Sequence, residues 1–148
     1  MIKEKIQSFL ESAGEYACYA LCLIKIAEQE TGEHIDIVVA LESGIERGFI
    51  KFNWDDYSDP DNFYLDFADK FLSMLTETVW KLRHIDGEYK PKENERVVYR
   101  WERKTSGGRI SHFRLPEWDS LEKSKTVAEG KIVSTRLFIR LGDGGYYG

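Results

Sequence analysis

The sequence predicts an α+β fold in which N-terminal helices pack against a C-terminal antiparallel β-sheet. Apolar residues recur at helical spacing over roughly the first half of the chain. Beyond Thr78 they alternate with polar residues, which is the pattern of half-buried strands. The length of 148 residues is typical of one domain with one hydrophobic core. We therefore expect a single domain over residues 1–148, with the helices on one face or end of the sheet.

Three helices are predicted in the first third of the chain. Apolar spacing indicates a first helix over 2–13 and a buried second helix over 16–31. Asp36 is placed to cap a third helix over 37–47, although the β-branched residues of 35–41 leave a strand as the alternative. A glycine, which readily adopts the left-handed conformation at a helix end, follows each helix: Gly14, Gly32 and Gly48.

A fourth helix is predicted after the turn-rich segment 55–62. We expect Asp59-Pro60 to open this helix, because a proline at the first helical position loses only an amide that has no partner there. The apolar face of the helix would consist of Phe63, Phe67, Phe71, Leu72 and Leu75.

Alternating residues predict four strands, over 79–84, 96–104, 109–115 and 131–141. Ser106-Gly107-Gly108 lies between the second and third strands and is a tight-hairpin signal. These two strands should therefore pair antiparallel. The glycine-rich tail from Gly142 to Gly145 is expected to fray.

Charge and composition exclude several kinds of partner. The formal net charge is -5 and Lys and Arg are scattered along the chain, so no basic stripe is expected to bind nucleic acid. The longest uncharged apolar run is far shorter than the roughly 20 residues that cross a bilayer. The N-terminus mixes charges into its apolar pattern, unlike a secretory signal. We expect a cytoplasmic protein without a membrane partner.

No cofactor or metal site is predicted. The glycine pairs 107–108 and 144–145 lack the strand-to-helix context of a phosphate-binding loop. Cys18 and Cys22, with dispersed histidines, lack the paired spacing of zinc ligands. The acidic segment 55–61 lacks the glycine and the final glutamate of a calcium loop. His34 and His84 are expected to be surface residues.

Cys18 is the candidate nucleophile, because it falls in the first turns of the predicted second helix. Unpaired amides and the helix dipole stabilise a thiolate at such a place and lower the pKa of the thiol. The alternative is that Cys18 is a small buried apolar side chain. Cys22 lies one turn deeper and is expected to be a core residue. Both thiols should be reduced, since their side-chain directions do not suit a disulfide.

His112 is the candidate general base. The alternation of its strand places it on the face opposite to Phe113 and Leu115. A histidine on a strand and a cysteine at a helix start, distant in sequence, is an arrangement in which imidazole takes the thiol proton. The alternative is a partly exposed strand histidine without a partner.

Asp119 is the candidate third member of this site. It follows the turn suggested by Pro116-Glu117, and could start the next strand and accept a hydrogen bond from the second imidazole nitrogen. That bond would select the tautomer of His112. Glu117 is a weaker candidate for the same role, and an ordinary turn aspartate is the alternative.

Several short motifs resemble those of compact papain-like cysteine peptidase domains of bacteria and their phages. They are Ala17-Cys18-Tyr19-Ala20-Leu21, Gly107 to Phe113, Trp118-Asp119-Ser120, Ser124 to Val127 and Gly130-Lys131-Ile132. They cover most of the chain in order. The resemblance implies a papain-like fold with Cys18 as nucleophile, His112 as general base and Asp119 as orienting acid, acting through a thioester.

One feature departs from the papain-like pattern. Those enzymes carry a glutamine shortly before the cysteine, where it helps to bind the oxyanion. Here Ser12 stands at that place and Gln7 lies farther upstream. Loss of one oxyanion donor costs on the order of 3 kcal/mol of transition-state stabilisation.

Three functional hypotheses follow. The first is a cysteine hydrolase, a peptidase or amidase, that acts on a peptide or amide substrate. The second is a catalytically inactive papain-like module of a phage or mobile element that binds a protein partner, and the third is a small-molecule acyltransferase. The second also draws on an expected aromatic surface of Trp54, Tyr57, Tyr64, Trp80, Trp101, Trp118, Tyr146 and Tyr147. Nothing in the sequence specifies the oligomeric state.

Overall fold

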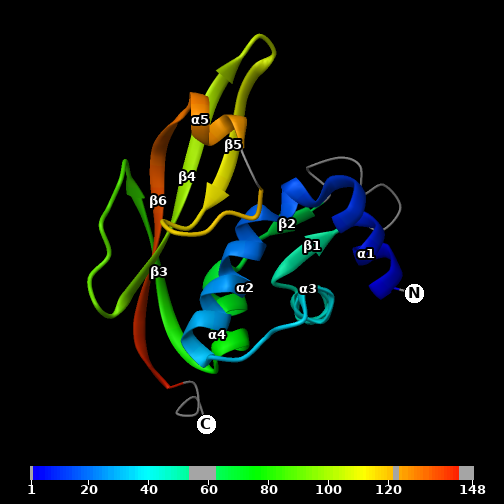
Figure 1. Cartoon of the computed structure of the whole chain (residues 1–148). Coiled ribbons are helices and arrows are strands. Elements are labelled where there is room, and N and C mark those ends of the chain that lie inside the picture. Colours follow the sequence, from blue (N-terminus) through cyan, green and yellow to red (C-terminus); the bar gives the residue numbers. More distant parts are fainter. Residues whose placement is uncertain (1, 54–62, 122–123, 144–148) are drawn as a thin grey trace.

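A computed structural model describes residues 2–53, 63–121 and 124–143. The predicted α+β class is confirmed, with N-terminal helices beside a four-stranded antiparallel sheet (Figure 1). The elements are α1 Ile2–Ala13, the 3-10 turn η1 Gly14–Ala17, α2 Cys18–Thr31, α3 Ile37–Glu46, β1 Ile50–Phe52, β2 Phe63–Leu65, α4 Ala68–Thr76, β3 Thr78–Asp86, β4 Glu95–Thr105, β5 Gly108–Arg114, α5 Lys125–Glu129 and β6 Lys131–Asp143.

The first three helices form where the sequence predicts them. Asp36 caps α3, because its Oδ1 accepts a hydrogen bond of 3.0 Å from the amide of Val39, so the alternative of a strand is wrong. Gly32 ends α2 in the left-handed conformation, with φ of 73°. One boundary differs, because η1 occupies the first two residues assigned to the second helix. Cys18 is therefore the first residue of α2.

The fourth helix was predicted to start too early. Phe63 lies in β2, and α4 begins at Ala68. Alternate burial along β2 and its antiparallel pairing with β1, in which Phe52 faces Phe63, show that this segment is extended. A strand of three residues is too short to show an alternating pattern, so its apolar residues were assigned to the helix that follows. The predicted turn and opening at Asp59-Pro60 lie outside the described residues.

The main sheet has the strand order β3-β6-β4-β5, and all its pairings are antiparallel. The predicted hairpin is confirmed, since Thr105 pairs with Gly108 across the turn. β5 is an edge strand. Gly142 and Asp143 pair with β3, so the expectation that they fray is wrong. Residues 144 and 145 lie outside the described chain.

The core lies between the helices and one face of the main sheet. Phe9, Phe71 and Phe138 are fully buried there. A smaller apolar cluster lies on Val97, Tyr99 and Leu137 of the strands β4 and β6. Burial of this extent supplies the main stabilisation of a domain of this size.

The expected aromatic surface is only partly present. Trp80 is 4% exposed, and its indole nitrogen donates to Thr76 Oγ1 at 2.9 Å, so its assignment to the surface is wrong. Tyr64 is 59% exposed. Trp101 and Trp118 are half-buried. The other four aromatic residues of the predicted set lie outside the described residues.

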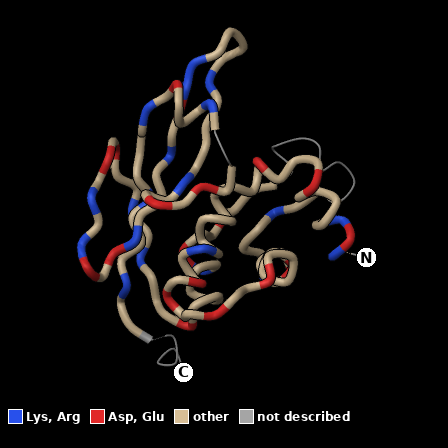
Figure 2. Tube along the Cα trace, viewed as in Figure 1, with Lys and Arg blue, Asp and Glu red and all other residues tan. Residues whose placement is uncertain are grey.

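Charge is distributed unevenly over the two layers. Lys and Arg outnumber Asp and Glu along the strands of the main sheet, whereas acidic residues predominate on α2 and α3 (Figure 2). Basic residues that are scattered along the sequence are thus partly gathered on the main sheet by the fold. Among the helices of the described residues, none is long and apolar enough to cross a membrane.

Candidate functional site

Cys18 opens α2 and lies against the edge strand β5. Its sulfur accepts a hydrogen bond of 3.4 Å from the backbone amide of Phe113. The residue is 6% exposed. The sequence therefore placed Cys18 correctly at a helix start, and the alternative that it is buried also holds.

His112 and Asp119 form a close pair. His112 Nε2 lies 2.6 Å from Asp119 Oδ1, and His112 is 3% exposed. Asp119 is held in turn by the amide of Leu121, which donates to the same oxygen at 3.0 Å. Asp119 lies in the loop after β5. The prediction that it starts a strand is therefore wrong. Glu117, the weaker candidate, is exposed.

This pairing selects the imidazole nitrogen that can act as a base. A carboxylate beside Nε2 accepts the proton that Nε2 carries, so in the neutral ring Nδ1 has the free lone pair. Nδ1 has no hydrogen-bond partner within residues 2–53, 63–121 and 124–143. His112 thus has one nitrogen held and one available.

Cys18 and His112 are neighbours through the backbone, without a direct hydrogen bond between their side chains in the described part of the chain. Phe113, whose amide holds the sulfur, immediately follows His112. The structure therefore brings Asp119 to His112 and the Cys18 sulfur to the backbone of Phe113, while the His112 side chain lies on the face of β5 opposite to that of Phe113. The thiol, in this arrangement, is bonded to the backbone and not to the imidazole.

Burial dominates the acidity of Cys18. Loss of hydration raises the pKa of the thiol to about 11, and the charge of Asp119 adds to the rise. The amides of Phe113, Tyr19 and Cys18 itself oppose it. The lowered pKa expected from the helix start is thus outweighed by desolvation. At neutral pH the resting side chain is a thiol, and a base must remove its proton before it can attack.

Cys22 is a core residue, as predicted. It is fully buried, and burial raises its pKa well above the ordinary value. Its sulfur lies 3.6 Å from the carbonyl oxygen of Phe113, to which the thiol donates. The two cysteines, one helical turn apart, thus bond to the amide and the carbonyl of the same residue on the sheet edge. Both are free of disulfides.

A cavity of about 460 Å³ opens beside Cys18. Its walls come from the start of α2, from β2 and from the helix-covered face of the main sheet. They include Glu15, Cys18, Tyr19, Tyr64, Asp66, His84, Ser111, Phe113 and Arg136. An acyl group bound there would lie beside the sulfur.

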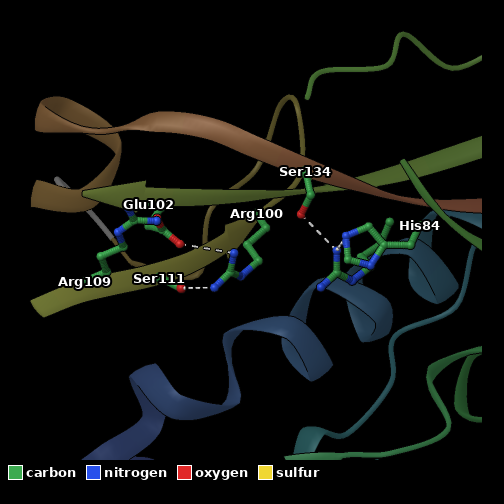
Figure 3. Close-up of polar contacts among 7 residues, drawn as sticks. His84, Arg100, Glu102, Arg109, Ser111 and Ser134 are labelled. Atoms are coloured by element: carbon green, nitrogen blue, oxygen red, sulfur yellow. Dashed lines mark hydrogen bonds and ion pairs between the residues drawn. The ribbon is translucent and has the colours of Figure 1, made fainter. Parts of the chain in front are cut away.

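Sequence reasoning missed two polar residues of this cavity, His84 and Arg136. His84 is exposed, as predicted, yet it also lines the cavity. Arg136 lies on β6 between Ser134 and Phe138, at the spacing that shares one face of a strand. The charge of Arg136, two residues before the apolar Phe138 on the same face of the strand, was the sequence feature that could have indicated a polar site. Figure 3 shows the polar contacts of this sheet face.

The two residues considered as oxyanion donors are engaged elsewhere. Ser12 donates to the carbonyl of Ser8 at 2.7 Å, and Gln7 donates to Glu11 at 3.1 Å, both within α1. The amide of Cys18 bonds to the carbonyl of Glu15 in the 3-10 turn. An oxyanion would therefore need a donor other than these, or a local rearrangement of η1.

Within the described residues, no three His, Cys, Asp or Glu side chains are grouped so as to hold a metal ion. His34 has an 87% exposed side chain and lies 3.0 Å from Glu28, in agreement with its predicted surface position.

No family model matches the chain, and no curated protein or solved structure matches it either.

Proposed function

We propose that the protein is a cysteine hydrolase of peptide or amide bonds, of papain-like design, with Cys18 as nucleophile and His112 as general base. Asp119 is the positioning residue that holds the imidazole. The observation that carries the proposal is the 2.6 Å contact of His112 with Asp119, one residue from the amide that holds the Cys18 sulfur.

The reaction would proceed in two steps, acylation of Cys18 and hydrolysis of the resulting thioester. His112 Nδ1 takes the thiol proton as the Cys18 sulfur attacks the carbonyl carbon, and the imidazolium then protonates the leaving amine as the C–N bond breaks. This leaves a thioester on Cys18. Water, deprotonated by His112, attacks the thioester, and its hydrolysis releases the carboxylic acid and returns the proton to the thiol. The raised pKa of Cys18 requires a base, which is the role given to His112.

The second candidate is an inactive binding module. It is favoured by the bonds of both cysteines to Phe113 and by the use of the Cys18 amide within η1. In that case the cysteines only cover the backbone groups of an edge strand.

Acyl transfer from p-nitrophenyl acetate separates the two candidates. The hydrolase should take up one acetyl group on Cys18, seen by intact-mass and peptide mass spectrometry, and lose it again by hydrolysis. Cys18→Ala should abolish the adduct, and His112→Ala should slow its formation by about a hundredfold or more. His34→Ala, whose side chain is 87% exposed, is the matched histidine control and should acetylate normally. Absence of both an adduct and p-nitrophenolate release above the level of Cys18→Ala, on folded protein, would exclude the hydrolase and favour the binding module.

A further inference from the structure

Arg136 places a positive charge in the cavity that also contains Cys18. It lies on β6 and faces the helices, on the same side of the sheet as the buried Phe138. The residue is half-buried. A charge that is partly removed from water requires compensation by hydrogen bonds or by an opposite charge.

The described partners of Arg136 satisfy only some of its hydrogen-bond donors, and none of them carries a negative charge. Its Nη1 lies 2.9 Å from His84 Nε2 and 2.9 Å from Ser134 Oγ. Its guanidinium carbon lies 5.6 Å from the centre of the Phe113 ring. Since Nη1 donates to it, His84 Nε2 is an unprotonated acceptor and carries no negative charge.

No carboxylate bonds to Arg136 anywhere in the described residues. Of the two acidic residues in the cavity wall, Asp66 pairs with Lys51 at 3.4 Å, and Glu15 is exposed. The Nε and Nη2 groups of Arg136 likewise have no hydrogen-bond partner there. Three of the five guanidinium N–H donors therefore have no partner among the described residues and can bind a ligand.

Arg100, on the neighbouring strand, shows what a satisfied guanidinium looks like on this sheet face. It lies 3.3 Å from Glu102 and donates to Ser111 at 2.6 Å (Figure 3). Arg109 pairs with the same glutamate at 3.1 Å. Arg136 therefore differs from both in having no carboxylate partner within the part of the chain that the structure describes.

We propose that Arg136 binds a carboxylate of the substrate in the cavity beside Cys18. A guanidinium presents paired N–H donors in a plane, which matches the two oxygens of a carboxylate. The Phe113 ring supports the guanidinium from one side. This inference rests on and deepens the proposed function: the substrate class becomes a peptide or amide with a free carboxylate close to the bond that is cleaved.

An NMR titration tests the site without using the thiol. The reporters are the backbone amides of Ser111, Phe113 and Arg136. The probes are N-acetyl-alanyl-alanine, whose only charge is its terminal carboxylate, its C-terminal amide as the neutral match, and N-acetyl-glutamic acid α-amide, whose only charge is on the side chain. The two acids distinguish a terminal from a side-chain carboxylate.

At least one acid should shift the reporter resonances saturably, and its half-saturating concentration should be at least about tenfold below that of the neutral amide. Arg136→Gln should remove this difference. Arg136→Lys, which keeps the charge but loses the planar fork, should retain part of it. Arg100→Gln is the matched control and should preserve it. Equal shifts with acid and amide, an absence of saturable shifts, or a preference that survives in Arg136→Gln would overturn the proposal.

The failure of this inference is distinguishable from the failure of the hydrolase. The carboxylate probes are not acylating agents and p-nitrophenyl acetate carries no carboxylate, so the two measurements can fail independently. Carboxylate binding without acetyl transfer would exclude the hydrolase and leave the binding site. Acetyl transfer without carboxylate binding would exclude only the role of Arg136.

Discussion

The imidazole of His112 is bonded through Nε2 to Asp119 at 2.6 Å, and the next residue along β5 holds the sulfur of Cys18. This relationship leaves Nδ1 as the nitrogen that can accept a proton. It also places a buried thiol, with a pKa raised to about 11, next to the strand that carries the base. The chemistry we propose follows from these two facts together.

The first prediction concerns the tautomer of His112. Asp119→Asn should lower the rate of acetyl transfer by about a hundredfold or more, because an amide can donate to Nε2 and so move the ring proton to Nδ1. The rate is measured by mass spectrometry of the Cys18 peptide. Thermal unfolding of the same sample is the control. An unchanged rate in folded Asp119→Asn would show that the pair does not position a base.

The second prediction concerns the packing of α3. A Cβ atom on Gly44 would lie 2.7 Å from Ile50 Cδ1 and 2.8 Å from the Phe71 ring. Gly44→Ala should therefore cost about 1–3 kcal/mol in the free energy of unfolding, because the core has no room for it. Gly14→Ala is the matched control: nothing lies within 4 Å of its Cβ position, so the change should be neutral or stabilising. Urea denaturation measures both, and equal effects would contradict the packing described here.

The third prediction concerns stability in acid. Glu95 accepts hydrogen bonds from the amide of Lys92 at 2.8 Å and from the hydroxyl of Tyr89 at 2.7 Å. These bonds lower the pKa of Glu95 below its ordinary value of 4.5. A carboxyl whose pKa is depressed by folding stabilises the folded state above its unfolded pKa, and this contribution is lost as the pH falls through the folded value.

Glu95→Gln should therefore flatten the loss of stability between about pH 5 and about pH 3. The glutamine oxygen can accept the same two hydrogen bonds, so the fold is retained. Urea midpoints measured across this range give the slope. A slope identical to that of the unmodified protein would show that Glu95 does not contribute to the acid response.

Much of the fold could be predicted because local signals coincide with tertiary contacts. The cap at Asp36 and the left-handed Gly32 delimit helices in the sequence as in the structure. The hairpin at Gly108 depends on a glycine with φ of 129°. β1 and β2 could not be predicted, because strands of three residues have no measurable period and their pairing is decided by burial against α1.

The candidate site was predictable only in part, for a similar reason. Residue type and order point to Cys18, His112 and Asp119, and the structure pairs His112 with Asp119 and Cys18 with the backbone of the residue after His112. The acidity of Cys18 depends on burial, which is set by packing against β5. The cavity wall is formed by strands distant in the chain. Arg136 and His84 meet only through the pairing of β6 with β3, which no local pattern reveals.

The pH profile of alkylation at Cys18 tests the central claim most directly. It compares iodoacetamide rates for Cys22→Ala, which isolates the signal, with rates for Cys22→Ala combined with His112→Ala. If His112 takes the thiol proton during the attack, iodoacetamide should alkylate Cys18 near neutral pH in the first protein but not in the second. The second should rise only toward the thiol pKa of about 11. Two superimposable profiles that both rise toward about 11 would contradict the account and leave Cys18 as a buried structural thiol.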